Sequence, residues 1–166
     1  MPTTLPQRAK LNRIRLLLLD VDGVMTDGGI YYSGRGEVLK KFNTKDGYGL
    51  VKLQKNGIRV GIITGRVSSI VKVRARELGI SELHQNLDNK LKTYLIIRKK
   101  FRLTDAQIAY IGDDEPDLPV LEQVGFSAAP ADAMQSVRAS VDYVCRRSGG
   151  DGAVREVVDL LLRARG

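Results

Sequence analysis

The chain has 166 residues, of which 43% are hydrophobic and 28% are charged, and its formal net charge is +8. This length predicts a single domain over residues 1–166, and the composition excludes an intrinsically disordered chain. The single cysteine, Cys145, excludes an intramolecular disulfide, and no apolar run approaches the roughly 18 residues that a membrane span needs. We therefore expect a cytoplasmic protein with no membrane partner.

The first strong element is the apolar run at residues 14–20, in which four leucines lead directly into Asp20. A continuous run of this kind predicts a strand that is buried on both faces. Residues 1–13 before it are polar and basic, and they predict a loose arm.

Two short β-prone runs follow at residues 29–32 and 37–42, on either side of a turn at residues 33–36. This spacing predicts a hairpin inserted between the first strand and the next helix. Both of its faces carry apolar side chains, and an isolated hairpin is only marginally stable in water. One face is expected to rest on the protein's own sheet and the other to need a partner.

The rest of the chain alternates between strand and helix patterns. Strands are expected at residues 59–64, near 83, and at 108–112, 126–128 and 142–144; helices are expected at residues 46–55, 67–78, 90–101, 117–124, 132–137 and around 154–161. This alternation predicts an α/β fold, a doubly wound and mainly parallel sheet with a β-hairpin insertion after the first strand.

Polar side chains that suit phosphoryl chemistry follow three of the predicted strands, and Lys90 begins a helix. They are Asp20 and Asp22 after the first strand, Thr64 after the second, and Asp113, Asp114 and Asp117 after residues 108–112. Because the carboxyl ends of parallel strands meet at one edge of a sheet, these groups are expected to converge. Several acids in one cleft need a counter-charge, and carboxylates with open positions beside them suit Mg²⁺. Together with a hydroxyl and a lysine, they predict phosphoryl transfer.

Each of these signals has a plainer interpretation when taken alone. An Asp-x-Asp-Gly turn can hold solvated acids, and a lone lysine is usually a surface residue. Basic residues spread along the chain favour a solvated surface over a nucleic-acid partner, so no nucleic acid is expected. A basic nucleic-acid-binding protein and a catalytically inactive scaffold remain the alternatives from other classes. His84 and Cys145 have no partners at metal or catalytic spacing, so structural roles are expected for both.

Four motifs, in this order, resemble those of the haloacid dehalogenase superfamily. They are Asp-x-Asp-Gly-Val-x-Thr-Asp-Gly from Asp20, Ile-Thr-Gly-Arg from Ile63, Asn-Lys-Leu from Asn89, and Gly-Asp-Asp-x-x-Asp-Leu-Pro-Val from Gly112. Residues 41–49 and 149–156, and the lack of a cap domain, resemble the 3-deoxy-D-manno-octulosonate 8-phosphate phosphatase family in particular. The resemblance covers residues 14–162.

The resemblance implies a Mg²⁺-dependent phosphatase that releases phosphate from an eight-carbon sugar-acid 8-phosphate in lipopolysaccharide biosynthesis. Asp20 is expected to be the nucleophile that forms an aspartyl phosphate, and Asp22 the general acid and base. Mg²⁺ would be held by Asp20, the backbone carbonyl of Asp22 and Asp113, with Asp114 and Asp117 in support.

The resemblance also implies which residues bind the substrate. Thr64 and Lys90 would bind the phosphoryl oxygens, and Asp22 would contact the leaving group. The residues expected to face the sugar acid or its phosphate are Asn43, Thr44, Lys45, Asp46, Gly47, Arg66 and Arg74. Two arginines are chemically sensible for a substrate with both a carboxylate and a phosphate, although each could instead be a helix-surface charge. The same chemistry on a nine-carbon, sialic-acid-type 2-keto acid 9-phosphate stays open as an alternative.

One position near the start of the predicted helix at residues 46–55 departs from the pattern of the family. Relatives often carry a basic residue at the position that lies two residues after Gly49. In this chain Val51 occupies that position, and the basic residue Lys52 comes one residue later. A one-residue shift turns a helical side chain by about 100°, so a substrate contact at Val51 is doubtful.

The resemblance implies a homotetramer whose interface is the hairpin at residues 29–42, which would lie over a neighbour's cleft in place of a cap.

Overall fold

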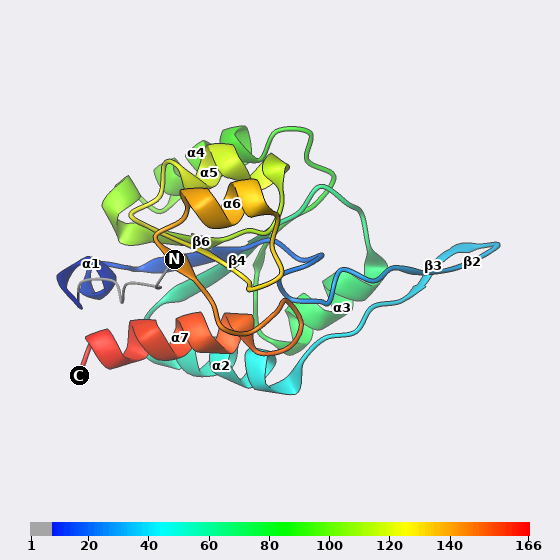
Figure 1. The fold of residues 1–166 in the computed structure, drawn as a ribbon, viewed down its shortest axis with the longest axis horizontal. Helices are drawn as coiled ribbons and strands as arrows, with labels where there is room; N and C mark the ends of the chain where they lie inside the picture. The colour runs from blue at the N-terminus through cyan, green and yellow to red at the C-terminus, as the bar shows by residue number, and fades with distance from the viewer. Residues whose placement is uncertain (1–7) are drawn as a thin grey trace.

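One parallel sheet forms the centre of the molecule in the computed structural model, which describes residues 8–166 (Figure 1). Its strand order is β5-β4-β1-β6-β7-β8, and every neighbouring pair is parallel. The strands are β1 (Leu16–Leu19), β4 (Arg59–Ile63), β5 (Glu82–His84), β6 (Ile108–Ile111), β7 (Phe126–Ala129) and β8 (Tyr143–Val144). The predicted doubly wound sheet is confirmed. From β1 the chain first adds β4 and β5 on one side and then β6, β7 and β8 on the other.

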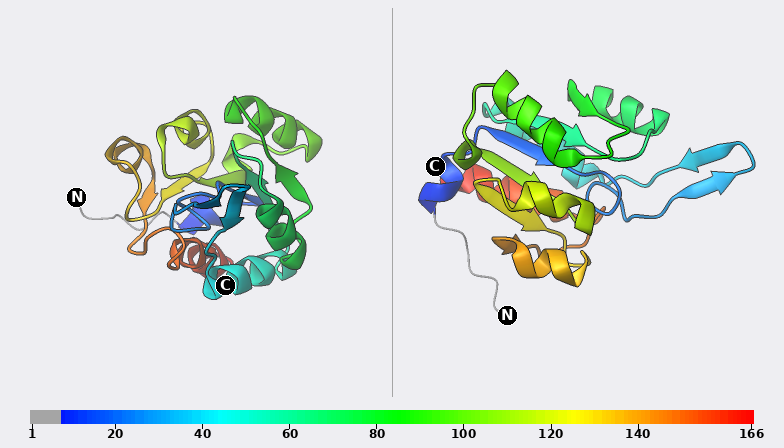
Figure 2. Two further views of the ribbon diagram at one scale, coloured as in Figure 1. Left: turned by 90° about the vertical axis from the view of Figure 1, so that its right-hand side faces the viewer. Right: turned by 90° about the horizontal axis from the view of Figure 1, so that it is seen from above.

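Helices cover both faces of this sheet (Figures 1 and 2). On one face lie α2 (Thr44–Lys55), α3 (Ser69–Glu77) and α7 (Ala153–Ala164), and on the other lie α4 (Lys90–Lys100), α5 (Leu118–Leu121) and α6 (Gln135–Ser140). Two short 3-10 helices, η1 (Asp105–Gln107) and η2 (Glu115–Asp117), precede β6 and α5. Along β1, Leu17 and Leu19 pack into the core beneath α2 and α7, while Leu16 and Leu18 pack beneath α4 and α5. The leucine run is therefore buried on both faces, as predicted.

Several predicted elements differ from the observed ones. Residues 8–12 are helical, as α1 (Arg8–Asn12), because Leu11 is buried in the core that α7 also lines; residues 1–7 of the predicted arm lie outside the described residues. Helix α6 begins at Gln135 rather than near residue 132. The preceding amides bond elsewhere, that of Ala133 to the Pro130 carbonyl in a turn (3.2 Å) and that of Met134 to the distant Asp113 carbonyl (2.8 Å). The helix predicted at residues 117–124 is observed as the 3-10 helix η2 followed by the short helix α5, which ends at Leu121.

The hairpin forms a sheet of its own from β2 (Tyr31–Ser33) and β3 (Gly36–Leu39) and projects away from the body of the protein (Figures 1 and 2). Tyr31, Tyr32, Val38 and Leu39 are all about half exposed or more, at 48–61%. The expectation that one face rests on the protein's own sheet is wrong, because the strands extend beyond the edge of the body. Over residues 8–166, no helix is long and apolar enough to cross a membrane.

A glycine pair braces the loop that follows β1. A side chain at Gly149 would place its Cβ 1.9 Å from the carbonyl oxygen of Gly23, and Gly150 (φ +67°) donates from its amide to the Val24 carbonyl at 3.1 Å. Only residues without a Cβ allow the two backbones to lie this close. The loop that carries Asp22 is thereby fixed by a segment more than a hundred residues away in the sequence.

Candidate active site

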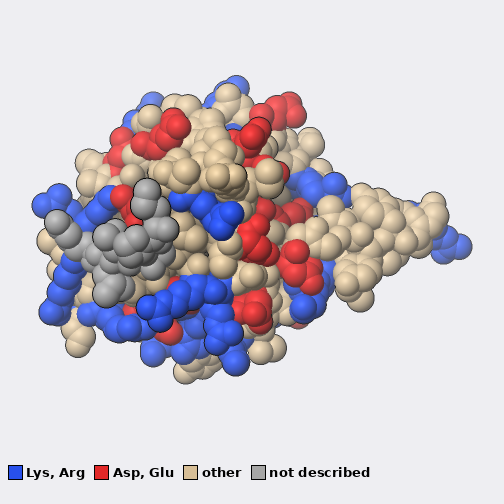
Figure 3. Space-filling view, viewed as in Figure 1, with Lys and Arg blue, Asp and Glu red and all other residues tan. Residues whose placement is uncertain are grey.

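The ends of three neighbouring strands meet at one cleft. Asp20 follows β1, Thr64 follows β4 and Asp113 comes two residues after β6. The cleft has a volume of about 610 Å³, and acidic side chains gather at this end of the sheet near the base of the hairpin (Figure 3). Its lining includes Asp20, Asp22, Thr64, Gly65, Arg66, Asn89, Lys90, Asp113, Asp114 and Asp117. The convergence predicted from the strand ends is thus observed.

Lys90 lies between two of the carboxylates. Its Nζ is 3.0 Å from Asp20 Oδ1 and 2.6 Å from Asp117 Oδ1, and its side chain is almost wholly buried. The side chain of Asn89 caps α4 by accepting from the amide of Lys92, so Lys90 enters the cleft from the first turn of a well-anchored helix. Burial alone would lower the pKa of Lys90, but its attraction to Asp20 and Asp117 outweighs burial and raises it. Lys90 is therefore a permanent cation in the cluster.

Asp117 has both of its oxygens occupied by hydrogen bonds. Oδ1 accepts from Lys90 and from the hydroxyl of Tyr110 (2.5 Å), and Oδ2 accepts from the amides of Asp113 (3.0 Å) and Asp114 (3.3 Å). Tyr110 is a residue that the sequence reasoning missed; the only available signal was a tyrosine inside a buried strand, whose hydroxyl must find a partner. Asp117 holds its neighbours in place and has little capacity left for another ligand.

Asp113 has the opposite character. Its Oδ1 is buried without a hydrogen-bond partner, and one oxygen each from Asp20, Asp113 and Asp117 lie within 4.8 Å of one another. Gly23 (φ +86°) makes room for this carboxylate, because a Cβ at that position would lie 2.0 Å from Asp113 Oδ2. A buried, unpaired carboxylate oxygen beside another carboxylate fits a hard divalent cation such as Mg²⁺.

The carboxyl groups of Asp20 and Asp113 also resist ionisation. Burial, followed by repulsion from Asp117, raises the pKa of Asp20 to about 6 despite its pairing with Lys90. Burial and the charges of Asp20 and Asp117 raise the pKa of Asp113 to about 8. Lys90 alone therefore does not balance the negative charge of the acidic cluster, and a divalent cation would supply the positive charge that is missing.

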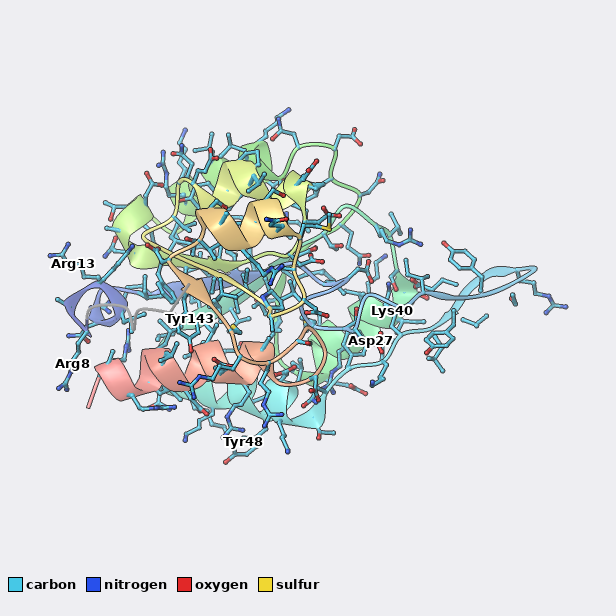
Figure 4. All side chains as sticks on the ribbon, in the orientation of Figure 1. Arg8, Arg13, Asp27, Lys40, Tyr48 and Tyr143 are labelled. Atoms are coloured by element: carbon cyan, nitrogen blue, oxygen red, sulfur yellow. The ribbon has the colours of Figure 1, made fainter. Side chains whose placement is uncertain are left out.

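Asp22 is held from the hairpin side. Lys40, which follows β3, donates to Asp22 Oδ1 and lies 2.9 Å from Glu37 Oε1, and Arg66 Nε lies 3.8 Å from Asp22 Oδ2. Figure 4 shows Lys40 at the base of the hairpin. Lys40 and Glu37 were not predicted as site residues, because charged residues in a hairpin are usually exposed at the surface. Lys41 behaves in that way, since 63% of its side chain is exposed.

Several predicted substrate residues lie outside this cleft in the single chain. Asn43 caps α2 and lines a separate pocket of about 270 Å³ together with Lys45, while Thr44 is exposed on the first turn. Asp46 is buried and accepts from the amide of Arg155 (2.8 Å), which ties α2 to α7. Gly47 lies against Arg74, which would be 2.4 Å from a Cβ there. Of the predicted sugar-acid contacts, only Arg66 lines the acidic cleft, and a binding role for the others stays a prediction.

The chain is similar to known proteins over nearly its whole length. A model of the haloacid dehalogenase-like hydrolase family matches residues 49–125. The 3-deoxy-D-manno-octulosonate 8-phosphate phosphatase KdsC of Escherichia coli strain K12 is 49% identical over 158 residues, which are 95% of this chain and 84% of that protein. The chain belongs to this phosphatase family. The resemblance of the four motifs is confirmed, and membership places the chain among the phosphoric monoester hydrolases.

Solved structures of the family share the fold closely. The phosphatase from Yersinia pestis has a TM-score of 0.93 at 47% identity and covers 95% of this chain and 85% of its own. The phosphatase from Moraxella catarrhalis, solved in complex with magnesium ion, phosphate ion and a KDO molecule, has a TM-score of 0.92 at 43% identity and covers 95% of this chain and 91% of its own. The acid-lined cleft described above belongs to a fold that holds a metal in this relative.

The pKa values generate a prediction for the metal-free protein. In the unfolded chain an aspartate loses its proton near pH 4, whereas folded Asp20 and Asp113 keep theirs to about pH 6 and 8. The folded state therefore holds more protons in this range, and the free energy of unfolding should fall as pH rises from 5 to 8. Urea titrations in chelator should show this fall, and saturating Mg²⁺ should reduce it.

The Asp113→Asn variant should flatten the pH dependence and be more stable than wild type at pH 8 by on the order of 1–3 kcal/mol in chelator. Asp114→Asn is the matched control, because Asp114 is exposed and its carboxylate accepts from the amide of Glu115. If both substitutions changed the free energy of unfolding equally, or if Asp113→Asn did not change it, the raised pKa could not be assigned to Asp113.

Proposed function

We propose that this protein is a Mg²⁺-dependent phosphatase that hydrolyses 3-deoxy-D-manno-octulosonate 8-phosphate to 3-deoxy-D-manno-octulosonate and phosphate. The observation that carries the proposal is the convergence of Asp20, Asp22, Thr64, Lys90 and Asp113 on one cleft. The names of its relatives support the substrate, and the reaction would serve lipopolysaccharide biosynthesis in the cytoplasm.

Asp20, Asp113 and the backbone carbonyl of Asp22 would hold Mg²⁺ in this proposal. The unpaired Asp113 Oδ1 supports that choice, and the four hydrogen bonds to Asp117 support a positioning role for Asp117 instead. Asp114 lies at the rim of the cleft and would orient solvent there. Bound Mg²⁺ would neutralise negative charge on the phosphoryl group.

The reaction would run in two balanced steps. A carboxylate oxygen of Asp20 attacks phosphorus, the bond between phosphorus and the ester oxygen breaks, and Asp22 gives its proton to the departing alkoxide. Water then loses a proton to Asp22 and attacks the same phosphorus, the bond to Asp20 breaks, and phosphate leaves. Lys90 and Thr64 bind the phosphoryl oxygens throughout, so that the developing charge meets preorganised donors.

The sugar acid would be recognised by cations at the mouth of the cleft. Arg66 is the arginine in the described cleft and suits a carboxylate. We propose that residues 43–47 and Arg74 contribute their contacts in a homotetramer. The exposed apolar hairpin supports this assembly, because a neighbouring subunit would cover it and close the open cleft against water.

A panel of sugar phosphates assayed with Mg²⁺ tests the proposed function. The eight-carbon 2-keto acid 8-phosphate is expected to give the highest kcat/KM, and chelation should abolish turnover. Asp20→Asn should lose more than about a thousandfold in kcat while its unfolding transition is preserved, because the substitution removes one charge from an acid-rich cluster. A higher kcat/KM for a nine-carbon 9-phosphate would change the substrate, and near-normal turnover by the variant would exclude Asp20 as nucleophile.

The proposed assembly has its own test. Replacing Tyr32 and Val38 with Asp should give smaller particles in light scattering and a large loss of activity, because both exposed side chains would be charged at the interface. Ile96→Asp on α4 is the matched control, since Ile96 is as exposed as these residues but lies away from the hairpin. A wild-type protein that is a fully active monomer at micromolar concentration would contradict this account of how the cleft is closed.

A further inference from the structure

Lys40 is unusual among the residues of the hairpin because its side chain is wholly buried. Its side-chain exposure is 0%, whereas Val38 and Leu39 just before it are about half exposed. A buried ammonium is costly unless carboxylates compensate it. Two do so here, since Lys40 donates to Asp22 and pairs with Glu37 at 2.9 Å. The two carboxylates therefore fix the position of the Lys40 ammonium group, which is shielded from solvent.

The partners of Lys40 connect it to the body of the protein. The second oxygen of Glu37 accepts from the hydroxyl of Ser68, and Ser68 in turn caps α3 by accepting from the amide of Val71 at 3.2 Å. A continuous chain of polar contacts therefore runs from the start of α3 through Glu37 and Lys40 to Asp22. Because each member is anchored at its other end, the chain resists movement of the Asp22 carboxylate.

Asp22 needs such an anchor. Gly149 and Gly150 brace the backbone of the turn in which it lies, but its side chain has one other charged contact, the longer one of 3.8 Å from Arg66 Nε to Oδ2. Lys40 engages Oδ1, so Oδ2 is the oxygen left to exchange a proton with a substrate in the cleft that Asp22 lines. A displacement of about 1 Å at such a group can cost roughly a hundredfold in rate.

We propose that Lys40 is a positioning residue that fixes Asp22 for proton transfer to the leaving group. Lys40 is not among the residues that line the cleft, so it acts through Asp22 rather than on the substrate. The inference rests on the proposed function, because it assumes that Asp22 protonates the departing alkoxide. It adds that the base of the hairpin is part of the proton-transfer machinery and not only a surface for assembly.

Leaving-group dependence gives a test that a merely structural role would not pass. The Lys40→Met variant keeps the length of the side chain and removes its charge. Its kcat/KM should fall by roughly tenfold to a hundredfold on the sugar-acid 8-phosphate, whose alkoxide needs a proton. On p-nitrophenyl phosphate, whose leaving group departs as a stable anion, kcat/KM should stay within about threefold of wild type. Lys41→Met is the matched control, since Lys41 is the adjacent, exposed lysine, and both substrates should be unaffected.

The outcomes separate the inference from the function beneath it. Equal losses on the two substrates, or no loss on the sugar phosphate, would overturn the role of Lys40, whereas a wild type inactive on every phosphate ester with Mg²⁺ would overturn the proposed function instead. If Lys40→Met does not fold, the double variant with Glu37→Gln removes the acid left without a cation. The same selective loss is expected there, and equal losses would overturn the proposal.

Discussion

The site depends on one buried ammonium shared between two carboxylates. Lys90 lies within 3.0 Å of Asp20 and 2.6 Å of Asp117, and Asp113 approaches the same group of oxygens. Two like charges about 4 Å apart repel by roughly 4 kcal/mol at an effective dielectric of about 20. One lysine among three acids reduces this repulsion without removing it. Burial, together with the remaining negative charge, raises the pKa of Asp20 and Asp113, and that charge favours binding of a divalent cation.

The fold provides this cluster by placing strand ends together. β1 is flanked by β4 and β6, so groups that follow these strands reach the same point although they are far apart in the sequence. Glycines then allow close approach: Gly23 makes room for the Asp113 carboxylate, and Gly149 makes room for the backbone of Gly23. The loops that carry the carboxylates are thus packed closely against one another before any substrate arrives, which is the preorganisation that phosphoryl transfer needs.

The sequence was sufficient for the features that local pattern decides. The leucine run before Asp20 predicted a strand buried on both faces, and acids after such runs predicted the cleft. It was insufficient where distant segments meet. Lys40 is buried only because the hairpin returns to Asp22, whereas the neighbouring Lys41 is exposed. Likewise, no periodicity in residues 43–47 shows that Asp46 binds the backbone of α7 while Asn43 and Lys45 line a different pocket.

The hairpin adds a second constraint on the same chemistry. Its apolar side chains are exposed on this chain and would be covered in the proposed tetramer, while its base holds Asp22 through Lys40. Assembly and proton transfer would therefore depend on the same short segment.

The central claim is that Asp20 is the group in this cluster that bonds to phosphorus. Borohydride added during turnover with Mg²⁺ reduces an acyl phosphate to an alcohol, so mass spectrometry of the digested protein should find homoserine in place of Asp20. Homoserine in place of Asp22 or Asp113, or unmodified aspartate at all three positions in a sample that is releasing phosphate, would contradict the account.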